Sequence, residues 1–200
     1  ITGNGGETGR ALVDEPLVRH VSFTGSTATG REVGASAGRN LKRVHLELGG
    51  NDAFIVTKSA DVKRAAAAAV RHRFYNCGQV CTSAKRILVH ESCEDTFVAH
   101  AKDLIEQIHV GNGLLGSKMG PLNNKDQLVF VSNAVDNIVS RDEGTLVTGG
   151  ERIEGKGYFY RPTLLRDVTP EVVSEEIFGP VMSVIPFRTD DEAIQIANST

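Results

Sequence analysis

The chain has 200 residues, of which 40% are hydrophobic and 24% are charged, a composition typical of a globular protein with one large core or parts of two domains. Its formal net charge of −3, without a basic block, argues against nucleic acid or an anionic membrane as a partner. No apolar run reaches the roughly 20 residues that span a bilayer, and the N-terminal ITGNGGETGR lacks signal-peptide features. We therefore expect a cytoplasmic protein that acts on small molecules.

The first part of the chain alternates strand and helix patterns. A strand-like IT opens it and runs into a glycine-rich turn. VRHVSFTG and KRVHLEL then predict two strands, and STATGREVGASAGRN between them predicts a helix. This alternation is typical of an α/β fold. The pair Gly49-Gly50, between two strand patterns, marks the expected crossing from one domain to the next.

The rest of the chain continues the α/β alternation. Helices are expected over residues 60–76, 93–110 and 124–141, the second of them capped by Ser92 with Asp95. Strands are expected over DAFIV, RILVH, TLVTGG, GYFYRPTLL and FGPVMSVIPF. A capping box, Thr189 with Glu192, opens a last helix shortly before the chain ends. Together with the absence of an initial Met, this end leads us to expect an internal fragment of a longer protein.

The stretch FTGSTATG joins the first predicted strand to the first predicted helix. Free N–H groups and the positive end of the helix dipole at such a junction favour a phosphate. The spacing of Gly25, Thr27 and Gly30 nevertheless departs from the usual G-x-G-x-x-G dinucleotide pattern. On these residues alone, an ordinary strand-to-helix turn remains the alternative.

Glu47 lies in HLELGG, an apolar strand pattern followed by two glycines. Burying a carboxylate costs free energy unless it has a partner, and a raised pKa would suit a general base. The glycines allow a ligand to approach closely. The alternative is a glutamate at a strand end that faces solvent.

The three cysteines are too few and odd in number for a disulfide framework, so free thiols in a reducing compartment are expected. Neither a histidine nor a further cysteine stands at zinc-site spacing from Cys77 and Cys81, and no metal is expected. Cys81 follows Gly78, which can end the preceding helix, and Lys85 and another cation come soon after it. Such surroundings lower a thiol pKa, which makes Cys81 the candidate nucleophile and leaves Cys77 as a packed side chain.

Four segments, FTGSTATG, LELGG, GQVC and EEIFGPV, occur in this order. None of these segments is specific for a function by itself. EEIFGPV alone, for example, would indicate the start of a strand preceded by two solvated glutamates. In company the four segments resemble the NAD(P)-dependent aldehyde dehydrogenase superfamily, as do MGPLNN and YRPTLL, over essentially the whole chain. The interval of 34 residues between Glu47 and Cys81 is also the separation expected for that family. The resemblance implies the end of a Rossmann-like cofactor domain over 1–49, then a truncated α/β catalytic domain of the aldehyde dehydrogenase fold over 50–200.

The resemblance also implies a role for each matching residue. Cys81 would attack the aldehyde and supply a backbone N–H to the oxyanion site, and Glu47 would activate the water that hydrolyses the thioester. The cofactor would be NAD or NADP, with Gly30 allowing close helix packing. The residues implied to bind it are Gly25 and Ser26 at the phosphates, Leu48 and Gly49 beside the nicotinamide, Glu176 at its ribose and Phe178 against its ring.

The substrate assignment depends on two segments. ELGGNDAFIV and GQVCTSAKR look closer to the succinate-semialdehyde dehydrogenase branch, in which the usual lysine position, Asn51 here, varies. Succinate semialdehyde is therefore the first substrate hypothesis. Arg73, eight residues before Cys81, is the candidate for the substrate carboxylate, and a solvated helix arginine is the alternative.

Two other functions remain open at this point. A CoA-acylating or phosphorylating relative is disfavoured because Glu47, a water-activating base, is retained. A non-catalytic nucleotide-binding scaffold is disfavoured because Cys81 and Glu47 are both present. Relatives pair through segments beyond Thr200, which implies a homodimer or homotetramer. The asparagine that completes the oxyanion hole and the segment that selects NAD or NADP would precede Ile1, so this chain alone is expected to be inactive.

Overall fold

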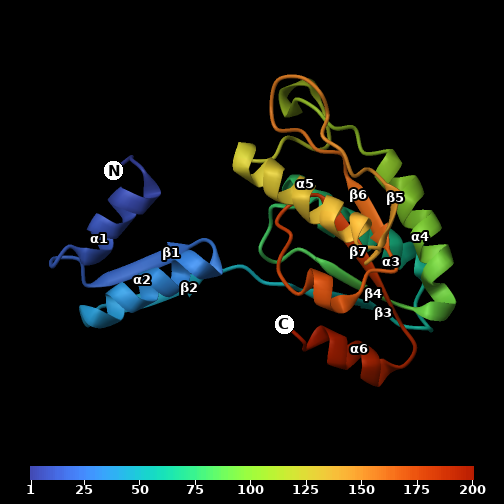
Figure 1. Cartoon of the computed structure of the whole chain (residues 1–200), viewed down its shortest axis with the longest axis horizontal. Coiled ribbons are helices and arrows are strands. Elements are labelled where there is room, and N and C mark those ends of the chain that lie inside the picture. The colour runs from blue at the N-terminus through green and yellow to red at the C-terminus, as the bar shows by residue number, and fades with distance from the viewer. The chain divides into compact units, whose positions relative to one another are not determined.

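The computed structural model describes residues 1–200 and divides them into two compact units, Ile1–Gly50 and Asn51–Thr200. Each unit contains helices and parallel strands (Figure 1), as the alternating sequence pattern predicted. The expected α/β fold class is therefore confirmed.

The first unit is built on one strand–helix–strand repeat. β1 (His20–Thr24) and β2 (Arg43–Glu47) are parallel neighbours, and α2 (Thr27–Arg39) makes the crossover between them. The N–H of Gly25 donates to the carbonyl oxygen of Glu47 at 3.0 Å, which holds the carboxyl ends of the two strands together. The candidate phosphate turn, which begins at Gly25, and the candidate base, Glu47, thus lie at the carboxyl ends of adjacent strands.

The start of the chain corrects the expectation of a strand followed by a glycine-rich turn. A π-helical segment, η1 (Gly5–Gly9), runs directly into α1 (Arg10–Asp14). The side chain of Asn4 caps this start by accepting a hydrogen bond from the N–H of Gly6 at 2.8 Å. Glycines disfavour a helix in isolation, so their pattern indicated a turn. Burial of Val13 and the asparagine cap outweigh that preference here.

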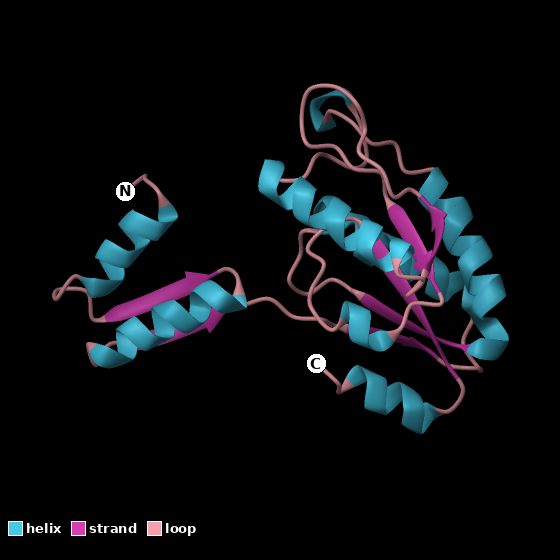
Figure 2. Cartoon of the chain, viewed as in Figure 1, coloured by secondary structure: helices cyan, strands magenta, loops and turns pink.

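The second unit has a five-stranded sheet in the order β3-β4-β7-β6-β5. The strands from β3 to β6 in this order are parallel, and β5 is antiparallel to β6. Figure 2 shows the sheet in magenta. Its strands are β3 (Ala53–Val56), β4 (Arg86–His90), β5 (Thr145–Thr148), β6 (Thr163–Arg166) and β7 (Val181–Phe187).

Helices cover both faces of this sheet, since six of the seven residues of β7 are buried. α3 and α4 pack against each other and against β7, and α5 contacts β5 and is drawn across the front of the sheet in Figure 1. No helix of the chain combines the length and the apolarity that a membrane crossing needs. The helices are α3 (Val62–Phe74), α4 (Glu91–Glu106), α5 (Lys125–Ser140) and α6 (Asp190–Ala197), with short turns η2 (Tyr75–Gly78), η3 (Gly113–Leu115) and η4 (Pro170–Val173).

The helix caps agree with the sequence in one case and differ in another. The hydroxyl of Thr189 accepts the N–H of Glu192 at 3.2 Å, which confirms the predicted cap of α6. α4 instead begins at Glu91, with Nδ1 of His90 accepting the N–H of Ser92 at 3.2 Å. The predicted Ser92–Asp95 cap is therefore wrong, and Asp95 pairs with a neighbouring strand's arginine.

Candidate active site

The turn after α3 directs the segment that carries Cys81. Asn76, Cys77 and Gly78 adopt positive φ angles of 50°, 57° and 70° in succession, a conformation that costs free energy for residues with a Cβ. A Cβ at Gly78 would collide with the carbonyl oxygen of Gly179. Glycine at this position therefore lets the turn lie directly against the segment before β7.

Cys81 is the exposed thiol of the three, and all three are free. Cys77 is 2% exposed, and burial raises the pKa of its thiol to about 12, opposed by the nearby Arg73. A thiol with that pKa stays protonated near neutral pH and is a poor nucleophile. The structure thus separates the two cysteines in the manner expected from the sequence: Cys77 is packed and Cys81 is accessible.

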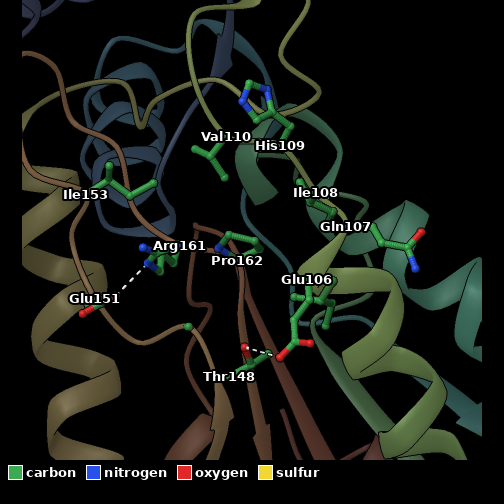
Figure 3. Close-up of a pocket in the computed structure, with 12 residues that line it drawn as sticks. Glu106, Gln107, Ile108, His109, Val110, Thr148, Glu151, Ile153, Arg161 and Pro162 are labelled. Atoms are coloured by element: carbon green, nitrogen blue, oxygen red, sulfur yellow. Dashed lines mark hydrogen bonds and ion pairs between the residues drawn. The ribbon is translucent and has the colours of Figure 1, made fainter.

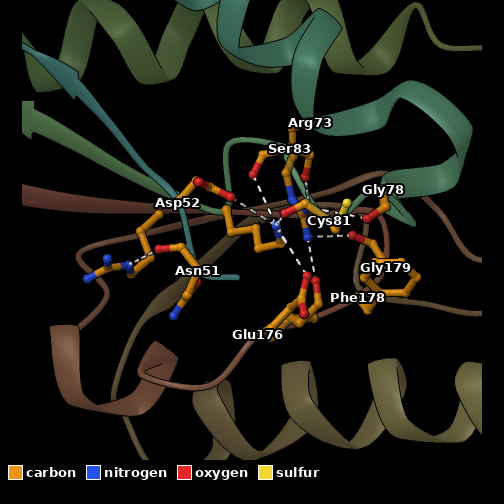
Figure 4. Close-up of polar contacts among 12 residues, drawn as sticks. Asn51, Asp52, Arg73, Gly78, Cys81, Ser83, Glu176, Phe178 and Gly179 are labelled. Atoms are coloured by element: carbon orange, nitrogen blue, oxygen red, sulfur yellow. Dashed lines mark hydrogen bonds and ion pairs between the residues drawn. The ribbon is translucent and has the colours of Figure 1, made fainter. Parts of the chain in front are cut away.

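Lys85 makes polar contacts to Cys81, Ser83, Asp52 and Glu176. Figure 4 shows these four partners close together. The Lys85 side chain is 2% exposed, and its ammonium donates to the carbonyl oxygen of Cys81 at 2.6 Å. It also donates to the carbonyl oxygen of Ser83 at 3.3 Å and to Oδ2 of Asp52 at 3.4 Å. Oε1 of Glu176 lies 3.2 Å from the same nitrogen. One buried cation therefore contacts the cysteine segment, the residue before β3 and the segment before β7.

Glu176 and Phe178 lie in the segment between η4 and β7, and Figure 4 shows both beside Cys81. Oε1 of Glu176 is buried and accepts no hydrogen bond, although it is close to Lys85. The amide of Gln127, from α5, donates to the carbonyl oxygen of Phe178 at 2.7 Å. The tertiary structure therefore brings together Cys81, Glu176 and Phe178, which the sequence analysis predicted as site residues. It also places Gln127 at this site, which the sequence analysis did not predict.

Arg73 requires a correction, because neither sequence interpretation describes it. It is fully buried rather than solvated, and its guanidinium has no free face for a substrate. Burial lowers its pKa to about 10, opposed by Glu176, so it remains charged at neutral pH. Its N–H groups all donate within the protein, to the hydroxyl of Ser83 (2.7 Å) and to the carbonyl oxygens of Gly78 (3.4 Å), Ile177 (2.6 Å), Gly179 (2.6 Å) and Val181.

These contacts make Arg73 a clamp between two segments. Gly78 and Ser83 flank Cys81, whereas Ile177 and Gly179 flank Phe178. The guanidinium fork is suited to several acceptors at fixed angles. Arg73 therefore fixes the cysteine segment relative to the segment that carries Glu176.

Glu47, in the first unit, is the last residue of β2, and its side chain is 63% exposed. Its Oε1 lies 2.9 Å from Nε2 of His45. Within that unit Glu47 is thus a glutamate at a strand end that faces solvent, rather than a desolvated carboxylate. Leu48 follows, and its side chain packs where a Cβ on Gly30 would otherwise stand, so Gly30 does allow close packing of α2.

A cavity of about 560 Å³ lies in the first unit between the η1–α1 segment and α2. Gly25 and Ser26 are exposed at the start of α2, where the Ser26 hydroxyl accepts the N–H of Thr29 at 3.2 Å. The helix start leaves further N–H groups without intrahelical acceptors. The sequence did not predict this cavity because the glycine-rich start of the chain indicated a turn. The residues that line the cavity include Gly9 and Val13 from η1 and α1, Phe23 from β1, and Thr29 and Val33 from α2.

A cavity of about 780 Å³ in the second unit lies elsewhere, at the end of α4 (Figure 3). Its polar contacts are Thr148 with Glu106 at 3.4 Å and Arg161 with Glu151 at 2.7 Å. No thiol and no predicted site residue lines it. Size alone therefore does not mark the candidate site.

Comparison with known proteins gives one family. The model of the aldehyde dehydrogenase family matches residues 1–200. A Staphylococcus aureus (strain MSSA476) protein named "Putative aldehyde dehydrogenase" is 41% identical over 205 residues, covering 100% of this chain and 43% of that protein. The chain thus spans less than half the length of this curated relative.

Solved structures agree with that match. The structure of 3,6-anhydro-L-galactose dehydrogenase with bound NADP has a TM-score of 0.94 and 39% identity, covering 100% of this chain and 43% of the other. A double mutant of betaine aldehyde dehydrogenase from Staphylococcus aureus, in complex with NAD+, has a TM-score of 0.92 and 34% identity, covering 99% and 41%.

Proposed function

Because the chain belongs to the aldehyde dehydrogenase family, we propose that the protein carrying it oxidises an aldehyde to a carboxylic acid and transfers the hydride to NAD or NADP. The observation that carries this proposal is the exposed Cys81 thiol beside Glu176, whose buried Oε1 has no hydrogen-bond partner. The activity is proposed for the complete protein, since the chain spans 43% of the relative's length.

In the first half of the reaction, Cys81 acts as the nucleophile. Its thiolate forms a bond from Sγ to the aldehyde carbon, and the carbonyl electron pair moves to the oxygen, where the Cys81 N–H donates a hydrogen bond. A bound nicotinamide would supply the acceptor for the hydride that this carbon releases. The oxygen's electron pair then re-forms the carbonyl, which leaves a thioester on Cys81.

In the second half, Glu47 acts as the general base. Its carboxylate takes a proton from a water molecule, whose oxygen forms a bond to the thioester carbon. The carbon–sulfur bond then breaks, the acid leaves, and Cys81 regains its thiolate. Glu47, which is exposed, then releases its proton to solvent. A carboxylate is too weak a nucleophile to displace sulfur itself but can activate water, and the exposed position of Glu47 at the end of β2 leaves it accessible to water.

The residues present fit a nicotinamide dinucleotide. Oε1 of Glu176, which has no hydrogen-bond partner, is an acceptor suited to ribose hydroxyls, and Phe178 offers a ring against the nicotinamide. The exposed start of α2, at Gly25 and Ser26, suits the phosphate-bearing part. Leu48 and Gly49 follow β2 next to this helix and would lie by the nicotinamide.

For the substrate we propose succinate semialdehyde, on the likeness of ELGGNDAFIV and GQVCTSAKR to that branch. Arg73 is buried, so another group of the complete protein would hold the substrate carboxylate. A homodimer or homotetramer in the cytoplasm is proposed from the family resemblance and is tested by light scattering and by fractionation.

The test of the function is aldehyde-dependent NAD(P)H formation by the complete protein, followed at 340 nm. We expect succinate semialdehyde to exceed uncharged aldehydes of similar length about tenfold in kcat/KM, as one charge contact would give. Higher kcat/KM for the uncharged aldehydes would contradict the substrate proposal. Absence of NAD(P)H with every aldehyde would contradict the function, and dependence on added CoA or phosphate would favour the acylating alternative.

Replacing Glu47 by glutamine is expected to stall the reaction at the thioester. One equivalent of NAD(P)H should form in a burst, after which turnover falls about a hundredfold, because a positioned general base contributes about that much. Rapid-mixing absorbance measures the burst, and added hydroxylamine should release the accumulated acyl group. A variant that loses the burst would show that Glu47 acts before hydride transfer.

A further inference from the structure

The contacts of Lys85 join two parts of the candidate site through one nitrogen atom. An ammonium has three N–H donors, and those of Lys85 go to the carbonyl oxygens of Cys81 and Ser83 and to Asp52. Each donor is therefore directed at a fixed main-chain or carboxylate acceptor. The lysine is 4% exposed, so water does not compete for these contacts.

Glu176 is the fourth oxygen group around this nitrogen and differs from the others. Its Oε1 forms an ion pair with Nζ at 3.2 Å and has no hydrogen-bond partner. The carboxylate is therefore held by charge and keeps its hydrogen-bonding capacity for another molecule.

We infer that Lys85 is a positioning residue that fixes the carboxylate of Glu176 relative to the main chain of Cys81. The Cys81 thiol and the carboxylate that binds the cofactor ribose then keep a constant relative position. The inference rests on the proposed function, in which Glu176 binds NAD or NADP. Hydride transfer depends steeply on the relative placement of the reacting atoms, so a link between their two supports affects both binding and rate.

Lys85→Met, in the complete protein, is expected to raise the dissociation constants of NAD+ and NADP+ about tenfold, within the range found for coupled neighbours. The constants are measured by titration calorimetry, and KM for the cofactor is followed in parallel. Because Lys85 acts through Glu176, the same substitution in a Glu176→Gln background should change these constants less than about twofold. Lys85→Arg, which keeps a charge, should recover part of the affinity.

Arg86→Met is the matched control, because Arg86 is the next residue and is also buried. Its guanidinium donates to the carbonyl oxygens of Asn51 (2.9 Å), Ile196 (2.6 Å) and Ala197 (2.9 Å), and it contacts neither Cys81 nor Glu176. Both variants should lower the thermal midpoint, but Arg86→Met should leave cofactor affinity within about twofold. A merely structural role of Lys85 would make the two variants behave alike.

The inference is overturned if Lys85→Met leaves the dissociation constants unchanged, or if its effect is as large in the Glu176→Gln background as in the wild type. Should Lys85→Met fail to fold, the same cycle is run with Lys85→Arg, whose displaced charge is expected to weaken binding about threefold only when Glu176 is present. A wild type that binds NAD(P)+ without turning over aldehydes contradicts the proposed function, while the cycle still decides on Lys85. If the wild type binds neither NAD+ nor NADP+, both the proposed function and the inference on Lys85 are wrong.

Discussion

Replacing Cys81 by serine in the complete protein is expected to lower aldehyde-dependent kcat/KM by about a thousandfold or more. A hydroxyl at this exposed position is ionised far less than a thiol near neutral pH, and no histidine is among the contacts of Cys81 to activate it. An alkoxide is also a poorer leaving group than a thiolate, so the acyl intermediate would hydrolyse slowly. NAD(P)H formation and its first-turnover burst should both disappear.

Cys77→Ala is the matched control for this experiment. Cys77 stands four residues earlier in the same turn, is buried, and has a pKa raised to about 12 by that burial. Its loss should affect packing but leave kcat/KM within severalfold of the wild type. If Cys81→Ser kept full turnover, or if Cys77→Ala removed it, the nucleophile assignment would be wrong. Calorimetric binding of NAD+ by Cys81→Ser shows whether the cofactor site has stayed intact.

Arg73→Met is expected to destabilise the protein by about 3–5 kcal/mol, the cost typical of removing one partner from a buried charged network. The substitution removes the guanidinium donor from four carbonyl oxygens and from the hydroxyl of Ser83 in a dry interior, and only the carbonyls of Ile177 and Gly179 keep a main-chain N–H outside the sheet. For a unit of this size the loss corresponds to a fall of roughly 10 °C in the thermal midpoint. Because the clamp joins the segments of Cys81 and Glu176, activity should fall below that expected from the unfolded fraction.

Arg71→Met is the comparison for Arg73→Met, because Arg71 lies two residues earlier on α3 and is exposed. Its thermal midpoint should stay within about 2 °C of the wild type, as for most surface substitutions. Arg73→Lys tests the geometry of the clamp, since lysine keeps the charge but not the planar fork, and an intermediate loss is expected. A fully stable Arg73→Met protein would contradict the clamp, and a shift in substrate preference without loss of stability would restore a role in substrate binding.

Much of the fold followed from local patterns. Most strands and helices coincide with the predicted periodic segments to within a few residues, because apolar spacing and caps such as Thr189 act over one or two turns. GYFYRPTLL is an exception, because its strand, β6, begins only at Thr163. The failures occurred where local preference and tertiary context disagree. Glycines near the N-terminus obscured the helical segment ending at Asp14, and Ser92 imitated a cap that His90 supplies.

The candidate site divides in the same way. The sequence by itself determined that Cys81 and not Cys77 is the exposed thiol, because Gly78 permits the positive φ that turns the chain out of α3. The assignments of Glu47 as base and of the two domains as cofactor-binding and catalytic stay predictions. What the sequence determined is thus the identity of chemically capable residues at local turns.

Only the tertiary structure decided what the buried cations do. Nothing local in the sequence predicts that Arg73 donates to the segment around Glu176, or that Lys85 forms an ion pair with the Glu176 carboxylate. That segment is distant in sequence and arrives because β7 pairs in parallel with β4. Burial then forces each N–H group to find an acceptor, since an unpaired charge away from water costs several kcal/mol. The pairing of β4 with β7 thereby places Arg73 and Lys85 where they support the candidate site.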